Sequence, residues 1–160
     1  FDVKMKSRYN YWNYTNGVLY LALNNLGASL KDSTYIQYLD DNFTFIFDHA
    51  DLFKQIFDEA GDQRNKVNLN NLFRMDMLDF CGTMGAALIE VYEVYPKPIY
   101  KEYIDLIADY ISNGEHRLND GTLCRLEPRA MTVWADDLYM SISFLSRENA
   151  PVKNLFSRYR

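Results

Sequence analysis

The chain has 160 residues, of which 48% are hydrophobic and only four are proline and seven glycine. This composition excludes a disordered chain and predicts a single domain with a hydrophobic core over residues 1–160. The net charge is −5 at pH 7 and no basic patch stands out, which argues against nucleic acid as a partner. No apolar stretch is long enough to span a membrane, so no membrane partner is expected.

Helical periodicity dominates the chain. It predicts six helices and one short amphipathic segment, which are, in chain order, residues 14–26, 34–49, 51–60 (the short segment), 79–95, 98–113, 135–147 and a last helix opened by Pro151. Gly27 is expected to stop the first helix, and Pro96 the helix over 79–95. The polar residues 61–74 and 116–131 are expected to form loops. No segment alternates convincingly as a strand, so the predicted fold class is all-α.

Short links between helices predict antiparallel helical hairpins. One link joins the first helix to the second, for which Asp32 or Ser33 is the expected cap. The other joins the helix over 79–95 to the helix that Pro98 opens. Longer polar segments separate these hairpins.

A weak internal repeat aligns three segments, residues 14–21, 77–84 and 134–141. It places Asn16, Asp79 and Asp136 at the starts of the first helices of successive hairpins. If these helices run parallel, the three polar side chains gather at one end, among helix N-termini that attract polar and anionic ligands.

Two aspartates at such an end have a catalytic and a structural interpretation. Carboxylates close to each other cannot both ionise cheaply, so Asp79 and Asp136 would form a pair with one raised pKa, which suits general acid–base work on a sugar. The structural interpretation is that each aspartate only caps a helix. The adjacent Asp137 is interpreted as a second cap or a surface acid, and Trp134 as a packing residue.

The sequence shows no metal-binding spacing and no cofactor motif. Cys81 and Cys124 are interpreted as lone thiols in the core or in loops, and His49 and His116 form no ligand motif.

Three motifs occur together at suitable separations: WNYTNGVLYLAL (12–23), MLDFCGTMGAALIEVYE (77–93) and WADDLYM (134–140). The last resembles the W-x-D-x-L-Y-M signature of the unsaturated glycuronyl hydrolases, glycoside hydrolase families 88 and 105. The second is similar to the segment that carries their other key aspartate, and the first to their N-terminal W-x-x-x-x-G-V motif. With YKEYIDLIADYI and HRLNDGTLCR in the expected order, the resemblance covers essentially the whole chain.

The resemblance implies catalytic roles for both aspartates. Asp136 is implied to be the catalytic acid/base, and Asp79 its partner, which hydrogen-bonds ring hydroxyls of the substrate. Trp134 and Asn16 are implied to line the same bowl and bind substrate.

The implied substrate is an oligosaccharide, made by a lyase, whose terminal uronic acid has a C4–C5 double bond. Hydration of that bond is implied to release the sugar without metal or nucleotide, in a bacterial cytoplasm or periplasm. Arg125 and Arg129 precede the signature, and either suits the planar uronate carboxylate. The competing interpretation is that both arginines face solvent.

The implied fold is an α6/α6 toroid of six hairpins, of which 160 residues hold about three. The chain is therefore expected to be the N-terminal half, with apolar flanks at both open edges. These flanks are Val18, Leu21 and Leu23 at one edge and Leu138, Ile142 and Leu145 at the other. They predict self-association or pairing with the missing C-terminal half. The alternative function is a non-catalytic helical-hairpin scaffold that binds carbohydrate or protein.

Overall fold

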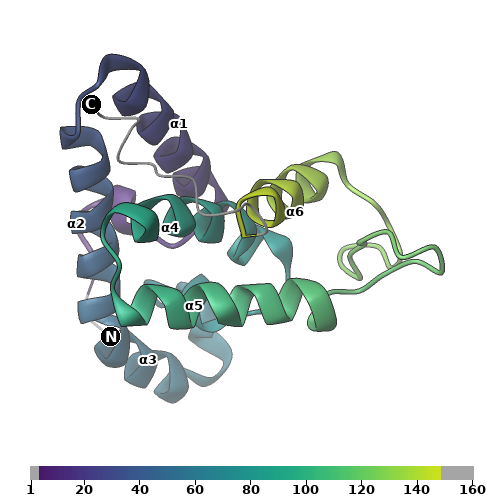
Figure 1. The fold of residues 1–160 in the computed structure, drawn as a ribbon. Helices are drawn as coiled ribbons and strands as arrows, with labels where there is room; N and C mark the ends of the chain where they lie inside the picture. Colours follow the sequence, from purple (N-terminus) through teal and green to yellow (C-terminus); the bar gives the residue numbers. More distant parts are fainter. Residues whose placement is uncertain (1–3, 149–160) are drawn as a thin grey trace.

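The computed structural model describes residues 4–148 and consists of helices and connecting loops (Figure 1). The α-helices are α1 (Tyr14–Leu30), α2 (Thr34–Asp48), α3 (Ala50–Glu59), α4 (Gly82–Val94), α5 (Pro98–Asp109) and α6 (Ala135–Glu148). Short 3₁₀ helices lie at Arg8–Asn10, Gly61–Lys66, Asn70–Phe73 and Leu78–Phe80, and one π turn at Tyr110–Gly114. Residues 4–148 contain no strand, only two isolated bridges in the loop before α6. The predicted all-α class is confirmed, and the helix expected from Pro151 lies outside the described residues.

Helix α4 forms the centre of the fold. Every residue from Gly82 to Val91 is buried, because α1 packs on one side of α4 and α6 on the other. Helix α2 packs against α1 and α5 against α4, so α1–α2 and α4–α5 form the two expected hairpins (Figure 1).

The contacts between α1 and α4 show that these two helices run parallel. Near their N-terminal ends, Gly17 lies directly against Thr83, where an added Cβ would come within 2.4 Å of the Thr83 hydroxyl. Further along, the Asn24 side chain donates a hydrogen bond to Glu90 at 3.1 Å.

Helices α4 and α6 are parallel by the same criterion. Gly82, the first residue of α4, lies against Met140, and Gly85 lies against Phe144 one turn later. Arg147 donates to the Glu90 carboxylate at 2.7 Å near the other end. The starts of α1, α4 and α6 therefore lie at one end of the fold, as the repeat predicts.

Aromatic side chains between the hairpins form much of the core. Trp12, Tyr20, Phe43 and Tyr100 are almost fully buried, and their rings meet edge to face. Phe43 belongs to the apolar face of α2, whose buried residues recur at helical spacing. This packing fixes the position of the α1–α2 hairpin, and with it the start of α1.

Helix α1 is longer than predicted, because Gly27 does not stop it. The helix continues to Leu30 and ends at Lys31, which adopts a left-handed conformation with φ 55°. A Cβ at Gly27 would lie 2.7 Å from the Tyr35 Cβ of α2. The glycine therefore permits the close approach of two helices and is not a terminator.

Residues 61–74 were expected to form a loop, and they contain two 3₁₀ helices instead. Val67, Leu69 and Leu72 point into the core and anchor this segment. Helix α4 also begins later than predicted, at Gly82, so Asp79 lies on the short 3₁₀ helix Leu78–Phe80 before it.

The expected apolar flanks are exposed in part. On α6, Leu138 and Ile142 are exposed, the latter by 62%, and on α1 Val18 is exposed by 39%. The expectation for Leu21 is wrong, since it is 4% exposed and belongs to the core. Among the described helices, none is both long and apolar enough to cross a membrane.

Candidate active site at the helix starts

Asp79 lies at the end of the fold where α1, α4 and α6 begin. Gly82 contacts Met140, the sixth residue of α6, so Asp79, three residues before Gly82, lies level with the first turn of α6. Its side chain is 22% exposed, yet its Oδ1 atom is buried and has no hydrogen-bond partner within residues 4–148. Unsatisfied buried oxygens are rare in folded proteins, so this atom marks a candidate site.

Arg125 reaches the same place from the loop before α6. Its Nε donates to Asp137 Oδ2 at 2.7 Å, and its Nη2 donates to Asp137 Oδ1. The same Nη2 lies 3.6 Å from Asp79 Oδ2, and the guanidinium carbon lies 4.4 Å from the centre of the Trp134 ring. One partly buried cation thus joins the segment before α4 to the start of α6.

The two adjacent aspartates of α6 have opposite environments. Asp137 is 4% exposed and ion-paired with Arg125, so its interpretation as a second cap or a surface acid is wrong. Asp136 is exposed, and its Oδ1 accepts a hydrogen bond from the Asp137 backbone N–H at 3.0 Å. Because successive residues of a helix point about 100° apart, only Asp137 faces the core.

The electrostatics of Asp79 reflect all of these neighbours. Burial raises the pKa of Asp79, and the Arg125 charge opposes this by lowering the pKa. The negative charges of Asp137 and Asp136 raise it further. Asp79 therefore holds its proton to higher pH than an ordinary aspartate, and it lies within electrostatic reach of Asp136.

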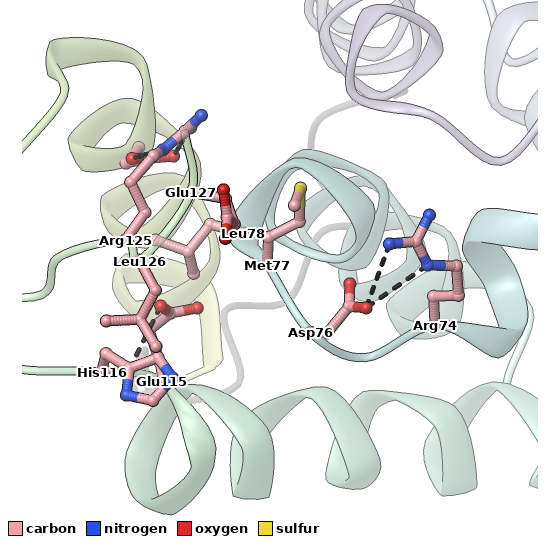
Figure 2. A pocket seen from close by; sticks show the side chains of 10 residues that line it. Arg74, Asp76, Met77, Leu78, Glu115, His116, Arg125, Leu126 and Glu127 are labelled. Carbon is pink, nitrogen blue, oxygen red and sulfur yellow. Dashed lines mark hydrogen bonds and ion pairs between the residues drawn. The ribbon is translucent and has the colours of Figure 1, made fainter. Parts of the chain in front are cut away.

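A pocket of about 290 Å³ opens beside this cluster (Figure 2). Its walls come from three segments: Arg125–Glu127, Arg74–Leu78 and the pair Glu115–His116, with Asp137 completing the lining. Figure 2 shows the Arg125 segment facing the Arg74–Asp76 ion pair across the opening. Each of the three segments contributes at least one charged side chain, beside the apolar Met77, Leu78 and Leu126, so the pocket suits a polar ligand.

Glu115 is a site residue that the sequence analysis missed. It is buried, and it accepts hydrogen bonds from the Tyr110 hydroxyl and from the His116 backbone N–H. Burial raises the pKa of Glu115, and the nearby charge of Asp137 adds to this effect. Nothing in the sequence marks Glu115, because glutamate is usually exposed and no motif sets this one apart.

The other predicted binding residues lie in different surroundings. Asn16 is buried, and its Nδ2 donates to the carbonyls of Arg8 and Tyr11, both at 2.7 Å. Its amide hydrogens therefore fix the segment before α1. Trp134 is exposed and stacks on Arg125. Arg129 is exposed in the loop and forms no ion pair with any described residue.

Within residues 4–148, no group of three or more histidine, cysteine, aspartate or glutamate side chains is arranged to hold a metal ion. Cys81 and Cys124 are both buried and unpaired with each other.

A protein-family model described as Glycosyl Hydrolase Family 88 matches residues 2–154. No curated protein matches the chain.

Proposed function

Since the chain belongs to glycosyl hydrolase family 88, we propose that it hydrates the C4–C5 double bond of an unsaturated uronic acid at the non-reducing end of an oligosaccharide. Its helical hairpins agree with the α/α toroid of the family. The family is one of glycosidases. The unsaturated substrate and the roles of single residues are our proposal.

The observation that carries this proposal is the convergence of Asp79, Asp136 and Arg125 at one end of three parallel helices. Two carboxyl groups in different environments can take different roles, one in the transfer of a proton and one in holding the substrate. Here Asp79 is half-buried with a raised pKa, whereas Asp136 is open to solvent. A partly desolvated site of this kind suits proton transfer to and from a sugar.

We assign Asp136 as the acid/base. Its carboxyl group protonates C4 of the substrate, and the electrons of the double bond form the new C4–H bond. The positive charge that develops at C5 is shared with the ring oxygen. Water then adds at C5 and gives a proton to the Asp136 carboxylate, which restores the acid. The resulting hemiketal opens by cleavage of the bond between C5 and the ring oxygen. The hemiacetal left at C1 then expels the remaining sugar.

The partner residues orient the substrate in this proposal. A protonated Asp79 carboxyl donates a hydrogen bond to a ring hydroxyl, a role that its raised pKa supports. Trp134 offers an exposed ring face beside the same carboxylates. Asn16 retains an acceptor oxygen for a substrate hydroxyl.

The substrate carboxylate needs a cation, and Arg125 supplies one beside Asp79. Within residues 4–148, both of its hydrogen bonds go to Asp137. In this proposal Arg125 therefore attracts the substrate carboxylate through its charge more than through hydrogen bonds. Arg129 remains a proposed second cation, because it is exposed and lies in the same loop.

The test is incubation of the chain with an unsaturated uronyl disaccharide in D₂O. Hydration predicts loss of the ultraviolet absorbance of the double bond and one deuterium on C4 of the released keto sugar. Attack at the anomeric carbon would leave the double bond intact, and would contradict the mechanism. Binding of the disaccharide without turnover, unchanged in Asp136→Asn, would favour the non-catalytic scaffold.

A further inference from the structure

A second cavity lies at the N-terminal end of α1, separate from the charged pocket. It has a volume of about 240 Å³ and lies between residues 11–13 and residues 65–71. Five asparagines contribute to its lining, which are Asn13, Asn65, Asn68, Asn70 and Asn71. No acidic residue of the described chain lines it, and Lys66 is its one charged member. We call it the asparagine cavity.

The loop that carries these asparagines is held firmly. Val67 and Leu69 are buried in the core and anchor it from below. The Asn68 Oδ1 accepts a hydrogen bond from the Met5 backbone N–H at 3.1 Å, and the Asn70 Nδ2 donates to the Val67 carbonyl at 2.9 Å. These bonds fix two of the amides before any ligand arrives, which lowers the entropic cost of binding.

Other asparagine side chains of the cavity have donors and acceptors that no hydrogen bond within residues 4–148 uses. Within residues 4–148 no hydrogen bond engages the side chains of Asn65 and Asn71, and Asn13 uses only its Oδ1, as the cap of α1. An asparagine side chain is both donor and acceptor, as is each hydroxyl of a sugar. Neutral amides therefore match hydroxyl groups, whereas the charged pocket beside Asp137 matches ions.

The asparagine cavity and the candidate active site share one end of the fold. The indole N–H of Trp12, which lines the cavity, donates a hydrogen bond to the backbone carbonyl of Phe80, the residue after Asp79. The volume of the cavity falls just below the range of roughly 300–1,000 Å³ of sites for drug-sized ligands, so it has room for about one sugar ring.

We propose that the asparagine cavity is a second carbohydrate subsite, which binds one uncharged sugar residue. This inference rests on the proposed function for the class of ligand, a glycan. The charged pocket then receives the uronate, and the asparagine cavity selects a neutral unit through hydrogen bonds from Asn65 and Asn71. Recognition of a longer glycan would thus depend on both ends of the loop over residues 65–78.

The test is titration of the isotope-labelled chain with methyl β-galactoside, methyl α-rhamnoside and methyl β-glucuronide, followed by nuclear magnetic resonance. At least one neutral glycoside should shift the side-chain amide signals of Asn65 and Asn71 at millimolar concentration. The variant Asn65→Ala/Asn71→Ala should bind that glycoside about tenfold more weakly, because two hydrogen bonds are lost. Both side chains border solvent-accessible space, and an unchanged backbone spectrum establishes that the variant is folded.

The matched control is Asn25→Ala, which removes an exposed asparagine of α1 and should leave the affinity unchanged. The inference is overturned if no neutral glycoside shifts the two amides, if the double variant binds as tightly as the parent, or if the glucuronide binds this cavity more tightly than either neutral sugar.

Turnover separates this inference from the proposed function. The variant Asp136→Asn should still bind the neutral glycoside, since Asp136 does not line the cavity. A chain that hydrates the unsaturated disaccharide but ignores neutral glycosides would refute only the subsite. A chain that binds neutral glycosides at Asn65 and Asn71 without hydrating the disaccharide would refute only the proposed function.

Discussion

At the scale of single residues, Asp136 and Asp137 carry the same carboxyl group but lie in different environments. The first is exposed, and the second is buried against Arg125. Sequence patterns cannot separate them, because Arg125 precedes Asp137 by twelve residues and reaches it only through the path of the loop. The signature motif implies the acid/base role for Asp136, and the structure shows that Asp137 holds Arg125 in an ion pair.

We predict that Asp136→Asn and Asp137→Asn affect different quantities. Asp136→Asn should lower kcat of an active protein by about 10²–10⁴-fold, as expected for loss of a general acid. Its free energy of unfolding should change by less than about 0.5 kcal/mol, because the side chain is exposed.

Asp137→Asn should instead lower the free energy of unfolding by about 3 kcal/mol. This value is at the low end for a broken buried ion pair, because Arg125 keeps its contact with Asp79. Urea unfolding and steady-state kinetics on both variants measure the two quantities. A normal kcat in Asp136→Asn would remove that residue from the mechanism, and unchanged stability in Asp137→Asn would contradict the importance of its ion pair.

Asp79 leads to a pH-dependent prediction. A raised pKa means that the folded state holds the proton more tightly than the unfolded chain. Protonation of Asp79 therefore adds stability below the ordinary aspartate pKa of about 3.9, and this contribution is lost as pH rises through the raised value.

The variant Asp79→Asn should not lose stability in this way as pH rises, because asparagine does not ionise. Relative to the parent, the variant should gain stability as pH rises from about 4 towards 7. Urea unfolding of both proteins across this range measures the difference. A parent that gains stability over the variant with rising pH would show that Arg125 outweighs burial at Asp79. The comparison is insensitive to turnover, so it tests the environment of the residue alone.

At the scale of helices and their connections, periodicity predicts most of the fold. The bounds of α2, α3 and α6 differ by one residue from those expected. Helix α5 begins at Pro98 as expected and ends four residues early, where the π turn over Tyr110–Gly114 replaces its last turn. The misses have tertiary causes. Gly27 permits contact with Tyr35 and does not end α1. Val67 and Leu69 anchor a segment in the core, although its asparagines suggest a free loop.

The contact between α4 and α6 depends on Gly82. A Cβ there would lie 2.6 Å from the Met140 Cβ and 2.7 Å from the Met140 carbonyl oxygen, so the backbones would have to separate. We predict that Gly82→Ala lowers the free energy of unfolding by about 1–3 kcal/mol, even though alanine favours helix by about 1 kcal/mol.

Separation of these helices should also move Asp136 relative to Asp79, so kcat of an active protein should fall with stability. Glu102→Ala, an exposed position on α5, is the control and should change neither quantity. Thermal unfolding and kinetics of the two variants provide the measurements. Unchanged stability in Gly82→Ala would show that α6 shifts without cost, and would contradict tight packing between Gly82 and Met140.

At the scale of the whole molecule, the three parallel helices lie side by side in the order α1, α4 and α6 within residues 4–148. Helix α4 lies between α1 and α6, whereas α1 and α6 each meet one of these neighbours within residues 4–148. The sequence predicts this arrangement through its repeat and its resemblance to a toroid. It does not predict which apolar residues stay exposed, as the burial of Leu21 shows.

The outer faces of α1 and α6 are apolar. Exposed members are Val18, Leu26 and Leu30 on α1 and Leu138, Tyr139 and Ile142 on α6. These side chains bring hydrophobic surface into contact with water, and large apolar patches are uncommon on monomers. We therefore predict that the chain of 160 residues self-associates through these faces.

The most exposed of these residues, Ile142, allows the sharpest test. Sizing combined with light scattering should give a mass above the 18.8 kDa of one chain, and the mass should rise with concentration. Ile142→Lys should shift the equilibrium towards monomer, because a charge cannot be buried cheaply in an apolar contact. It should leave the free energy of unfolding of the monomer within about 0.5 kcal/mol, since the side chain is exposed. Gln55→Lys adds the same charge on the exposed face of α3 and should leave the association unchanged. A monomer at every concentration would show that the outer faces of α1 and α6 remain in water, and the association would then be refuted.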